Sequence, residues 1–273
     1  MITWAQSLLI DSDSALLDAQ VLLAYALDKE TIYLMTWPER EISKEQQSKF
    51  EGLIEKRCSG VPVAHLVGIR EFWSLPIRVN DSTLIPRPDS EILVESALDI
   101  CEANANILDL GTGTGAIILA LANERPNANC VGIDFSQKAV DLAIDNATQL
   151  AISNVLFKQS DWFENVTGKF DVIVSNPPYI DKNDAHLKQG DVRFEPLSAL
   201  VAGNKGLADI QIIAKQAKKY LEAGGYLLIE HGFDQGESVR LILQSNGYSA
   251  VRTIKDYGDN DRICIGAYNE QVE

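Results

Sequence analysis

The fold is decided by the stretch Ile107-Leu108-Asp109-Leu110-Gly111-Thr112-Gly113-Thr114-Gly115-Ala116. Its first four residues, three of them apolar, are typical of a buried strand, and a helical pattern follows from about residue 115. Glycines at such a junction let the backbone turn tightly and approach a ligand closely, because they lack a Cβ. The order of strand, glycine loop and helix predicts an α/β protein whose loop holds a cofactor.

Outward from this stretch, strand and helix patterns alternate to the end of the chain. Strands are predicted at 107–110, 130–133, 155–157, 171–175 and 226–229, and around residues 251 and 263. Helices are predicted near 115–124, 136–150, 208–221 and 235–246. This order predicts a doubly wound, mostly parallel, Rossmann-like sheet of seven strands. The last two strands are predicted to form a hairpin through residues 257–260, which makes one edge antiparallel.

The chain divides into three predicted regions. Residues 1–70 show helical periodicity, and Thr3 with Gln6 and Ser43 with Gln46 have the spacing of capping boxes. Residues 71–88 form an extended or hairpin linker, and residues 89–273 form the α/β domain. The helical region is interpreted as a small bundle that docks a substrate, with a purely structural cap as the alternative.

Composition limits the class of protein. The 273 residues carry a net charge of −15, with 24 basic against 39 acidic side chains, which argues against a nucleic-acid duplex as the main partner. No apolar run approaches the ~20 residues that a membrane span needs, and the N-terminus lacks the charged region of a signal peptide. The four cysteines are scattered and do not cluster with the three histidines. We therefore expect reduced cysteines, no metal site and a cytoplasmic location.

A second motif, Asn176-Pro177-Pro178-Tyr179, follows the strand predicted at 171–175. Two prolines make this backbone stiff and unable to extend a sheet. The motif then presents the Asn176 amide, the Pro177 carbonyl and the Tyr179 ring, which together suit a planar NH2 group. The alternative is a turn that only ends the strand.

Two further residues end predicted strands. Asp134 follows the glycine loop by ~20 residues, where an acid can accept hydrogen bonds from ribose hydroxyls. Trp162, next to Asp161, is placed to cover an adenine face, with a core position as the alternative. The loop also satisfies the dinucleotide fingerprint, so a nicotinamide cofactor remains a rival interpretation.

Taken together, the glycine loop, Asp134 and the Asn-Pro-Pro-Tyr motif resemble the class I methyltransferases that use S-adenosylmethionine to methylate planar NH2 groups. Within that class, the chain is most similar to the peptide chain release factor glutamine methyltransferases, essentially from end to end. Four stretches carry this resemblance: Leu84-Ile-Pro-Arg-Pro-Asp-Ser-Glu91, Ser160-Asp-Trp-Phe163, Asn176-Pro-Pro-Tyr-Ile180 and Asp191-Val-Arg-Phe-Glu-Pro-Leu-Ser-Ala-Leu200.

The resemblance implies methylation of the glutamine side-chain amide in the Gly-Gly-Gln motif of class 1 release factors, which would be the protein partners. S-adenosylmethionine would be the cofactor and S-adenosylhomocysteine the product, with no direct contact with nucleic acid or membrane. The implied catalytic residues are Asn176, Pro177 and Tyr179. Substrate binding is implied for Asn176, Pro177, Pro178 and Tyr179. Cofactor binding is implied for Gly111, Thr112, Gly113, Thr114, Gly115, Asp134, Trp162 and Asn176.

Some features depart from this pattern or stay open. Ser90 stands where threonine is expected, and Gly203-Asn204-Lys205-Gly206 lacks an acid and has no assigned role. His231 is interpreted as structural. The alternative activities are methylation of adenine amino groups in nucleic acid, a nicotinamide-dependent oxidoreductase and a catalytically silent nucleotide-binding domain.

Overall fold

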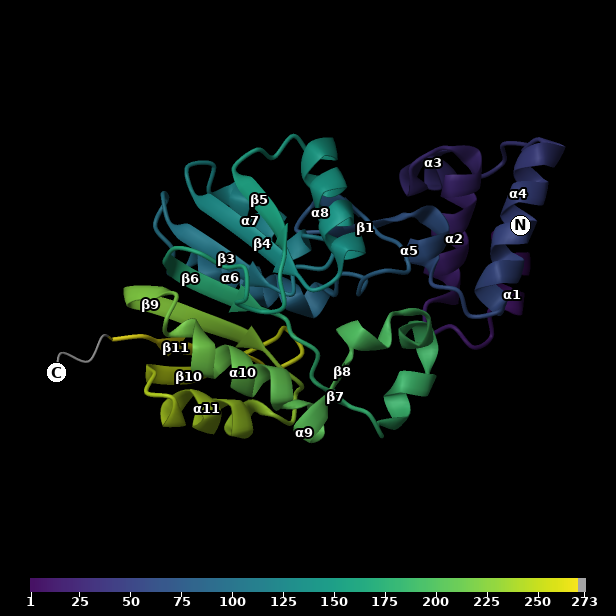
Figure 1. Cartoon of the computed structure of the whole chain (residues 1–273). Helices are drawn as coiled ribbons and strands as arrows, with labels where there is room; N and C mark the ends of the chain where they lie inside the picture. The colour runs from purple at the N-terminus through teal and green to yellow at the C-terminus, as the bar shows by residue number, and fades with distance from the viewer. Residues whose placement is uncertain (270–273) are drawn as a thin grey trace. The chain divides into compact units, whose positions relative to one another are not determined.

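A computed structural model describes residues 1–269 of the chain (Figure 1). The chain forms two compact units. One consists of Met1–Ile69 with Ala185–Phe194, and the other of Arg70–Asp184 with the chain from Glu195 onward. Each unit has a hydrophobic core of its own. The last four residues of the domain predicted over 89–273 lie outside the described residues.

The first unit is helical. Its helices are α1 (Ile2–Leu8), α2 (Ala15–Leu27), α3 (Thr31–Thr36), α4 (Lys44–Cys58) and α5 (Val63–Val67), with the 3-10 turns η2 (Ala185–Lys188) and η3 (Gly190–Phe194). The fully buried side chains of Leu22, Phe50 and Ile54 lie at the centre of its core. Apolar residues at helical spacing on α2 and α4 therefore bury one face of each helix against the other.

Helix ends in this unit test the capping predictions. Ser43 caps α4 with a complete capping box, because its hydroxyl accepts from Gln46 N at 3.1 Å and the Gln46 side chain accepts from Ser43 N at 3.0 Å. The predicted cap at Thr3 is wrong, since α1 begins at Ile2 and Met1 is its N-cap. A capping-box spacing alone does not fix where a helix starts.

Arg57 of α4 joins three parts of the first unit. Its guanidinium donates to Asp18 of α2 at 2.8 Å and to Asp191 of η3 at 2.7 Å. The Arg57 side chain is largely buried, so these two carboxylates satisfy a charge that is shielded from water. This pair of bonds ties the segment Ala185–Phe194 to the helices.

The second unit is built on a seven-stranded sheet with the order β10-β11-β9-β6-β3-β4-β5. The strands are β3 (Asn106–Leu110), β4 (Asn129–Asp134), β5 (Val155–Gln159), β6 (Phe170–Ser175), β9 (Leu221–Glu230), β10 (Ser249–Lys255) and β11 (Asp261–Ala267). The pairs from β5 to β9 are parallel, and β11 pairs antiparallel with both β9 and β10. The predicted mostly parallel sheet with one antiparallel edge is confirmed.

Helices cover both faces of this sheet. They are α6 (Glu91–Leu98), α7 (Ala116–Glu124), α8 (Gln137–Gln149), α10 (Ala208–Ala217) and α11 (Gly236–Ser245), with the short turns η1 (Pro88–Ser90), η4 (Leu197–Ala199) and α9 (Gly203–Gly206). Ile107 packs with α6, α7 and α8, whereas its neighbour Leu108 packs with α10 and α11. Alternate strand residues thus enter two cores, which is the doubly wound arrangement.

Two further sheets, each of two strands, are separate from the seven-stranded sheet. β1 (Ile69–Phe72) pairs with β2 (Leu75–Arg78), in the region predicted as an extended or hairpin linker. β7 (Ile180–Asp181) pairs in parallel with β8 (Val201–Ala202). Within residues 1–269, no helix has both the length and the apolar character that are needed to cross a bilayer.

The order of the strands fixes where a ligand can bind. From β3 the chain adds β4 and β5 on one side, and β6 then returns to the other side of β3. Strand order therefore reverses between β3 and β6, and ligands of open α/β sheets bind in the crevice at the carboxyl ends of such strands. The glycine loop follows β3, and the Asn-Pro-Pro-Tyr motif follows β6.

Candidate active site

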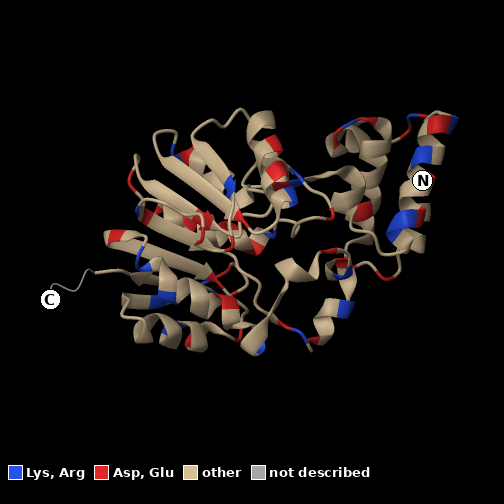
Figure 2. Ribbon diagram, viewed as in Figure 1, with Lys and Arg blue, Asp and Glu red and all other residues tan. Residues whose placement is uncertain are grey.

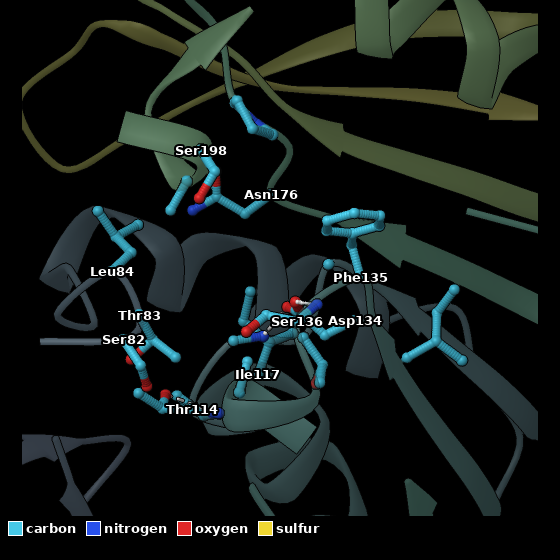
Figure 3. A pocket seen from close by; sticks show the side chains of 18 of the residues that line it. Ser82, Thr83, Leu84, Thr114, Ile117, Asp134, Phe135, Ser136, Asn176 and Ser198 are labelled. Atoms are coloured by element: carbon cyan, nitrogen blue, oxygen red, sulfur yellow. Dashed lines mark hydrogen bonds between the residues drawn. The ribbon is translucent and has the colours of Figure 1, made fainter. Parts of the chain in front are cut away.

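A cavity of about 350 Å³ lies at this reversal point (Figure 3). Its walls come from the loops after β3, β4, β5 and β6, and from the segments 82–90 and 198–199. Figure 3 shows Asp134, Phe135 and Asn176 around one hollow. Its volume is in the range of pockets that take small ligands and cofactors.

The glycine loop forms one wall. Gly111, Thr112, Gly113 and Thr114 line the cavity. Gly113 has φ +55°, which lets its amide donate to Asp134 Oδ2 at 2.9 Å. Gly115 does not line the cavity: it opens α7 with φ +82°, and a Cβ there would lie 3.1 Å from the Cβ of Ala143. Gly115 therefore serves close packing of α7.

Asp134 is fixed by the backbone on both sides of it. Its carboxylate accepts from Gly113 N at 2.9 Å and from Ser136 N at 2.8 Å. Burial raises the pKa of Asp134, and these two hydrogen bonds oppose that shift. Each oxygen keeps a further lone pair, so the carboxylate can still accept from a ligand hydroxyl in the cavity.

A second acid lies beneath the loop. Asp109 is fully buried and accepts from the Thr112 hydroxyl at 2.6 Å, whereas its Oδ1 atom has no hydrogen-bond partner among the described residues. Burial raises the pKa of Asp109 to about 7. Asp109 does not line the cavity and acts on the loop through Thr112.

Aromatic residues line the part of the cavity nearest β4 and β5. Trp162 lines the cavity, and its ring lies 3.7 Å from the position of a Cβ on Gly111. Asp209 also lines the cavity, and the Trp162 side chain opposes the rise in the Asp209 pKa that burial causes. Phe135 was not singled out in the sequence, although it follows Asp134 directly; it is 70% exposed and lines the cavity. The signal that could have identified Phe135 is its position: it is a large apolar residue directly after the acid that ends a strand.

The Asn-Pro-Pro-Tyr motif forms the opposite rim. Asn176 and Pro178 line the cavity, whereas Pro177 is buried and Tyr179 packs against the core formed by α10 and α11. The Asn176 amide nitrogen donates to Ser90 Oγ at 3.1 Å. The Asn176 carbonyl oxygen is therefore the atom of this side chain that can accept a hydrogen bond from a ligand in the cavity.

Tyr179 is held from behind by residues that sequence analysis did not connect with it. Its carbonyl accepts from Gln235 Nε2 at 3.0 Å, and its hydroxyl donates to Glu230 at 3.4 Å. Gly206 has φ +82°, and a Cβ on it would overlap the Tyr179 carbonyl oxygen. The loop Gly203–Gly206 thus has a role: it packs directly behind the rim.

The linker segment is fastened to the segment after Phe194 by one buried acid. Glu195 accepts from Ile85 N at 2.9 Å and from Arg87 Nη2 at 2.6 Å. Both segments line the cavity. The linker segment contributes Leu84, Pro86 and Arg87, and the segment after Phe194 contributes Ser198 and Ala199. Glu195 therefore holds together two sequence stretches that lie far apart in the chain.

A buried hydroxyl in the cavity wall lacks a partner. Thr83 is 2% exposed, lines the cavity, and its Oγ1 atom has no hydrogen-bond partner in the structure of residues 1–269. A buried polar group of this kind is costly unless something bonds to it. Thr83 is a candidate ligand contact that no sequence pattern indicated.

Charge around the cavity is mainly negative. Of the described residues that line it, Arg87 is the one base, and Asp134, Asp161 and Asp209 are acids. Acids also outnumber bases along the chain, by 39 to 24 (Figure 2). Within residues 1–269, no group of three or more His, Cys, Asp or Glu side chains is placed to hold a metal ion. His231 is fully buried, and burial lowers its pKa.

Comparison with known proteins places the chain in a family. A model described as a methyltransferase domain matches residues 102–258, and one described as the PrmC N-terminal domain matches residues 1–68. The release factor glutamine methyltransferase of Shewanella oneidensis is 56% identical over 268 residues, which cover 97% of this chain and 94% of that protein. The protein of the same name from Escherichia coli is 51% identical over 259 residues, or 94% of each chain.

A solved structure supports the fold. A methyltransferase from Pyrococcus furiosus superposes with a TM-score of 0.56 at 21% identity, covering 71% of this chain and 89% of that one. The seven-stranded sheet and the glycine loop after its first strand agree with this likeness. The chain belongs to the release factor glutamine methyltransferase family, within the methyltransferases of class I fold.

Proposed function

We propose that this protein methylates the side-chain amide nitrogen of the glutamine in the Gly-Gly-Gln motif of class 1 peptide chain release factors, using S-adenosylmethionine and releasing S-adenosylhomocysteine. The observation that carries the proposal is the position of Asn176, a fixed amide acceptor in the same cavity as the glycine loop. Membership of the family supplies the substrate class.

The cavity fits the cofactor on three counts. Residues 111–114 bring backbone close to the ligand, Asp134 offers lone pairs to ribose hydroxyls, and Trp162 and Phe135 offer aromatic faces to an adenine. The unpartnered Thr83 hydroxyl can bond to a polar group of the ligand. When bound, S-adenosylmethionine supplies an electrophilic methyl group on a positively charged sulfonium, and the acids around the cavity suit that charge.

The rim residues act on the glutamine amide. An amide nitrogen is a poor nucleophile because its lone pair is delocalised into the carbonyl. As that nitrogen attacks, its N–H bonds become more acidic, so fixed acceptors bind the transition state more strongly than the ground state. Asn176 Oδ1 would accept one hydrogen and the Pro177 carbonyl the other. Pro178 and Tyr179 would shape the surface on which the amide lies.

The charges around the cavity bear on the alternative substrate. A nucleic acid whose adenine entered this cavity would bring phosphates toward Asp134, Asp161 and Asp209. Such binding depends on Lys and Arg near the phosphates, and Arg87 is already paired with Glu195. The charges therefore support a protein substrate. The sequence predicts that the reaction takes place in the cytoplasm.

The first unit carries the proposed docking role. Several of its large apolar side chains are exposed, among them Ile10, Leu17, Ile32, Met35 and Trp37. If they contact the release factor, Met35→Ala combined with Trp37→Ala should raise the KM for the release factor severalfold at unchanged kcat, which steady-state kinetics would measure. A fall in kcat with unchanged KM would contradict docking through this surface.

The test of the proposed function is mass spectrometry of an unmodified class 1 release factor after incubation with this protein and S-adenosylmethionine. A release factor in which the Gly-Gly-Gln glutamine is replaced serves as the control. One added methyl group at that glutamine, absent from the control, is the expected result. Absence of methylation with cofactor binding intact would reject the substrate and leave the cofactor site in place.

A further inference from the structure

The hydroxyl of Ser90 lies between the rim and a buried acid. Ser90, at the junction of η1 and α6, is 3% exposed. Its oxygen accepts from Asn176 Nδ2 at 3.1 Å, and its hydroxyl opposes the rise in the pKa of Glu230, a buried acid at the end of β9. Three residues from distant parts of the chain thus form one polar group, in which the Asn176–Ser90 hydrogen bond joins two of them.

The direction of the Asn176–Ser90 hydrogen bond follows from what each group can donate and accept. A serine hydroxyl has one hydrogen, and an ionised carboxylate can only accept. A Ser90 hydroxyl whose hydrogen points toward Glu230 can only accept from Asn176, and this is the direction of the 3.1 Å bond. The NH2 group of Asn176 must then face Ser90, and its carbonyl oxygen must face the other way.

The surroundings of Glu230 favour this role. Glu230 is 1% exposed, its Oε1 atom accepts from the Tyr179 hydroxyl at 3.4 Å, and its Oε2 atom has no hydrogen-bond partner among the described residues. Arg262 stabilises the charge of Glu230 from β11, and Arg262 also pairs with Asp256 at 2.9 Å and lies 3.7 Å from Asp89. Burial raises the pKa of Glu230 to about 7, and the Ser90 hydroxyl and Arg262 oppose this shift by stabilising the ionised form.

We infer that Ser90 is a positioning residue which, oriented by Glu230, fixes the carbonyl oxygen of Asn176 toward the substrate amide. This inference rests on the proposed function for the identity of the substrate. With the Asn176 amide reversed, an NH2 group would meet the NH2 group of the substrate, and two donors cannot bond to each other. The Asn176–Ser90 hydrogen bond therefore selects substrates that donate N–H.

The first arm of the test removes the hydroxyl. Ser90→Ala should lower kcat about tenfold, the effect of one lost hydrogen bond in the transition state, without changing the KM for S-adenosylmethionine. Ser90→Thr keeps the hydroxyl and should retain kcat. The matched control is Ser96→Ala, because Ser96 is a nearby buried serine, in α6, that does not line the cavity. Its kcat should equal that of the unaltered protein.

The second arm asks whether Ser90 acts through Asn176. In an Asn176→Ala background, Ser90→Ala should cause no further loss of kcat, because the group that it orients is already gone. A full additional tenfold loss in the double variant would overturn the inference, as would normal kcat in the Ser90→Ala single variant. Additive losses would indicate that Ser90 only supports the local structure.

An NMR readout separates failure of the inference from failure of the proposed function. The Asn176 side-chain NH2 protons should be protected from solvent exchange in the unaltered protein and in Ser90→Thr, and should lose protection in Ser90→Ala. Unchanged protection in Ser90→Ala would overturn the inference whatever the substrate. A normal NMR result with no methylation of any release factor would reject the proposed function alone.

Discussion

The glycine loop after β3 and the rim after β6 lie at the ends of neighbouring strands, yet different parts of the chain hold them. The loop is fastened by the next strand, through Gly113 and Asp134, which are 21 residues apart. The rim is fastened by Ser90, Glu230 and Gln235, which lie between 51 and 86 residues from the rim residues that they contact. The rim therefore depends on the assembled fold, whereas the loop depends on one strand-helix-strand unit.

The largest expected effect concerns the buried acids behind the two regions. Burial raises the pKa of Asp109, behind the loop, and of Glu230, behind the rim, to about 7. The folded protein then binds these protons more tightly than the unfolded chain, so this contribution to stability is full below about pH 4 and is lost as pH rises through 7. Asp109→Asn should therefore raise the free energy of unfolding at pH 8 by up to about 4 kcal/mol.

Urea unfolding at pH 5 and pH 8 would measure this gain. Glu230→Gln should gain less than Asp109→Asn, because Ser90, Tyr179 and Arg262 stabilise the charge of Glu230, whereas Asp109 has Thr112 as its donor. Equal pH dependence in the unaltered protein and in Asp109→Asn would show that Asp109 does not titrate in this range.

The next largest effect is expected from a substitution behind the rim, at Gly206. Gly206→Ala should destabilise the protein by about 3 kcal/mol and lower kcat, because the added Cβ overlaps the Tyr179 carbonyl oxygen at a positive φ. Gly168→Ala is the matched control: Gly168 has φ +89° with open space around it, so its cost should be only about 1 kcal/mol. Thermal unfolding would compare the two. Equal costs would mean that backbone strain, and not the close approach to Tyr179, accounts for the effect.

The third prediction tests whether the rim acts on the substrate amide while the loop binds the cofactor. Asn176→Ala removes one acceptor of the substrate amide, worth about 1 to 3 kcal/mol, so kcat/KM should fall roughly 5- to 150-fold. Calorimetry should give an unchanged Kd for S-adenosylhomocysteine. A weakened Kd would instead assign Asn176 to the cofactor, which the sequence analysis also allowed.

The smallest effect is expected from a substitution at the glycine loop, which should weaken cofactor binding and leave kcat nearly unchanged. Asp134→Asn places an NH2 group against a backbone N–H of Gly113 or Ser136 and weakens acceptance from the ribose, so the Kd for S-adenosylhomocysteine should rise about tenfold. At saturating S-adenosylmethionine, kcat should stay within about twofold, because the rim is intact. A loss in kcat alone would contradict the division of roles between loop and rim.

The sequence was sufficient for the parts of the fold that rest on periodicity. Strand runs such as 171–175 and the glycine loop predicted the sheet and its reversal point, and the comparisons confirm the family. These features are local or repeat with a fixed period, so one stretch of chain contains the whole signal. The roles of the individual site residues stay predictions until variants are measured.

The supporting contacts of the site were not accessible from sequence. Ser90 was noted only as a replacement for threonine, and Gly206 and Glu230 had no assigned function, because each acts on a residue more than 25 positions away. Thr83 belongs to no sequence pattern: its importance is that its hydroxyl is buried and has no hydrogen-bond partner among residues 1–269. Contacts of this kind depend on where side chains point after folding, which spacing does not report.

The path of the chain between the two units has a practical consequence. The backbone leaves the sheet-containing unit after Asp184, contributes Ala185–Phe194 to the helical unit, where Arg57 binds Asp191, and returns at Glu195. The two units therefore share three covalent junctions and are not separable modules. A protein truncated at residue 70 would keep residues 185–194 while losing Arg57, so a clean deletion of the helical unit must remove both segments, and any gene fusion or domain exchange must transplant both.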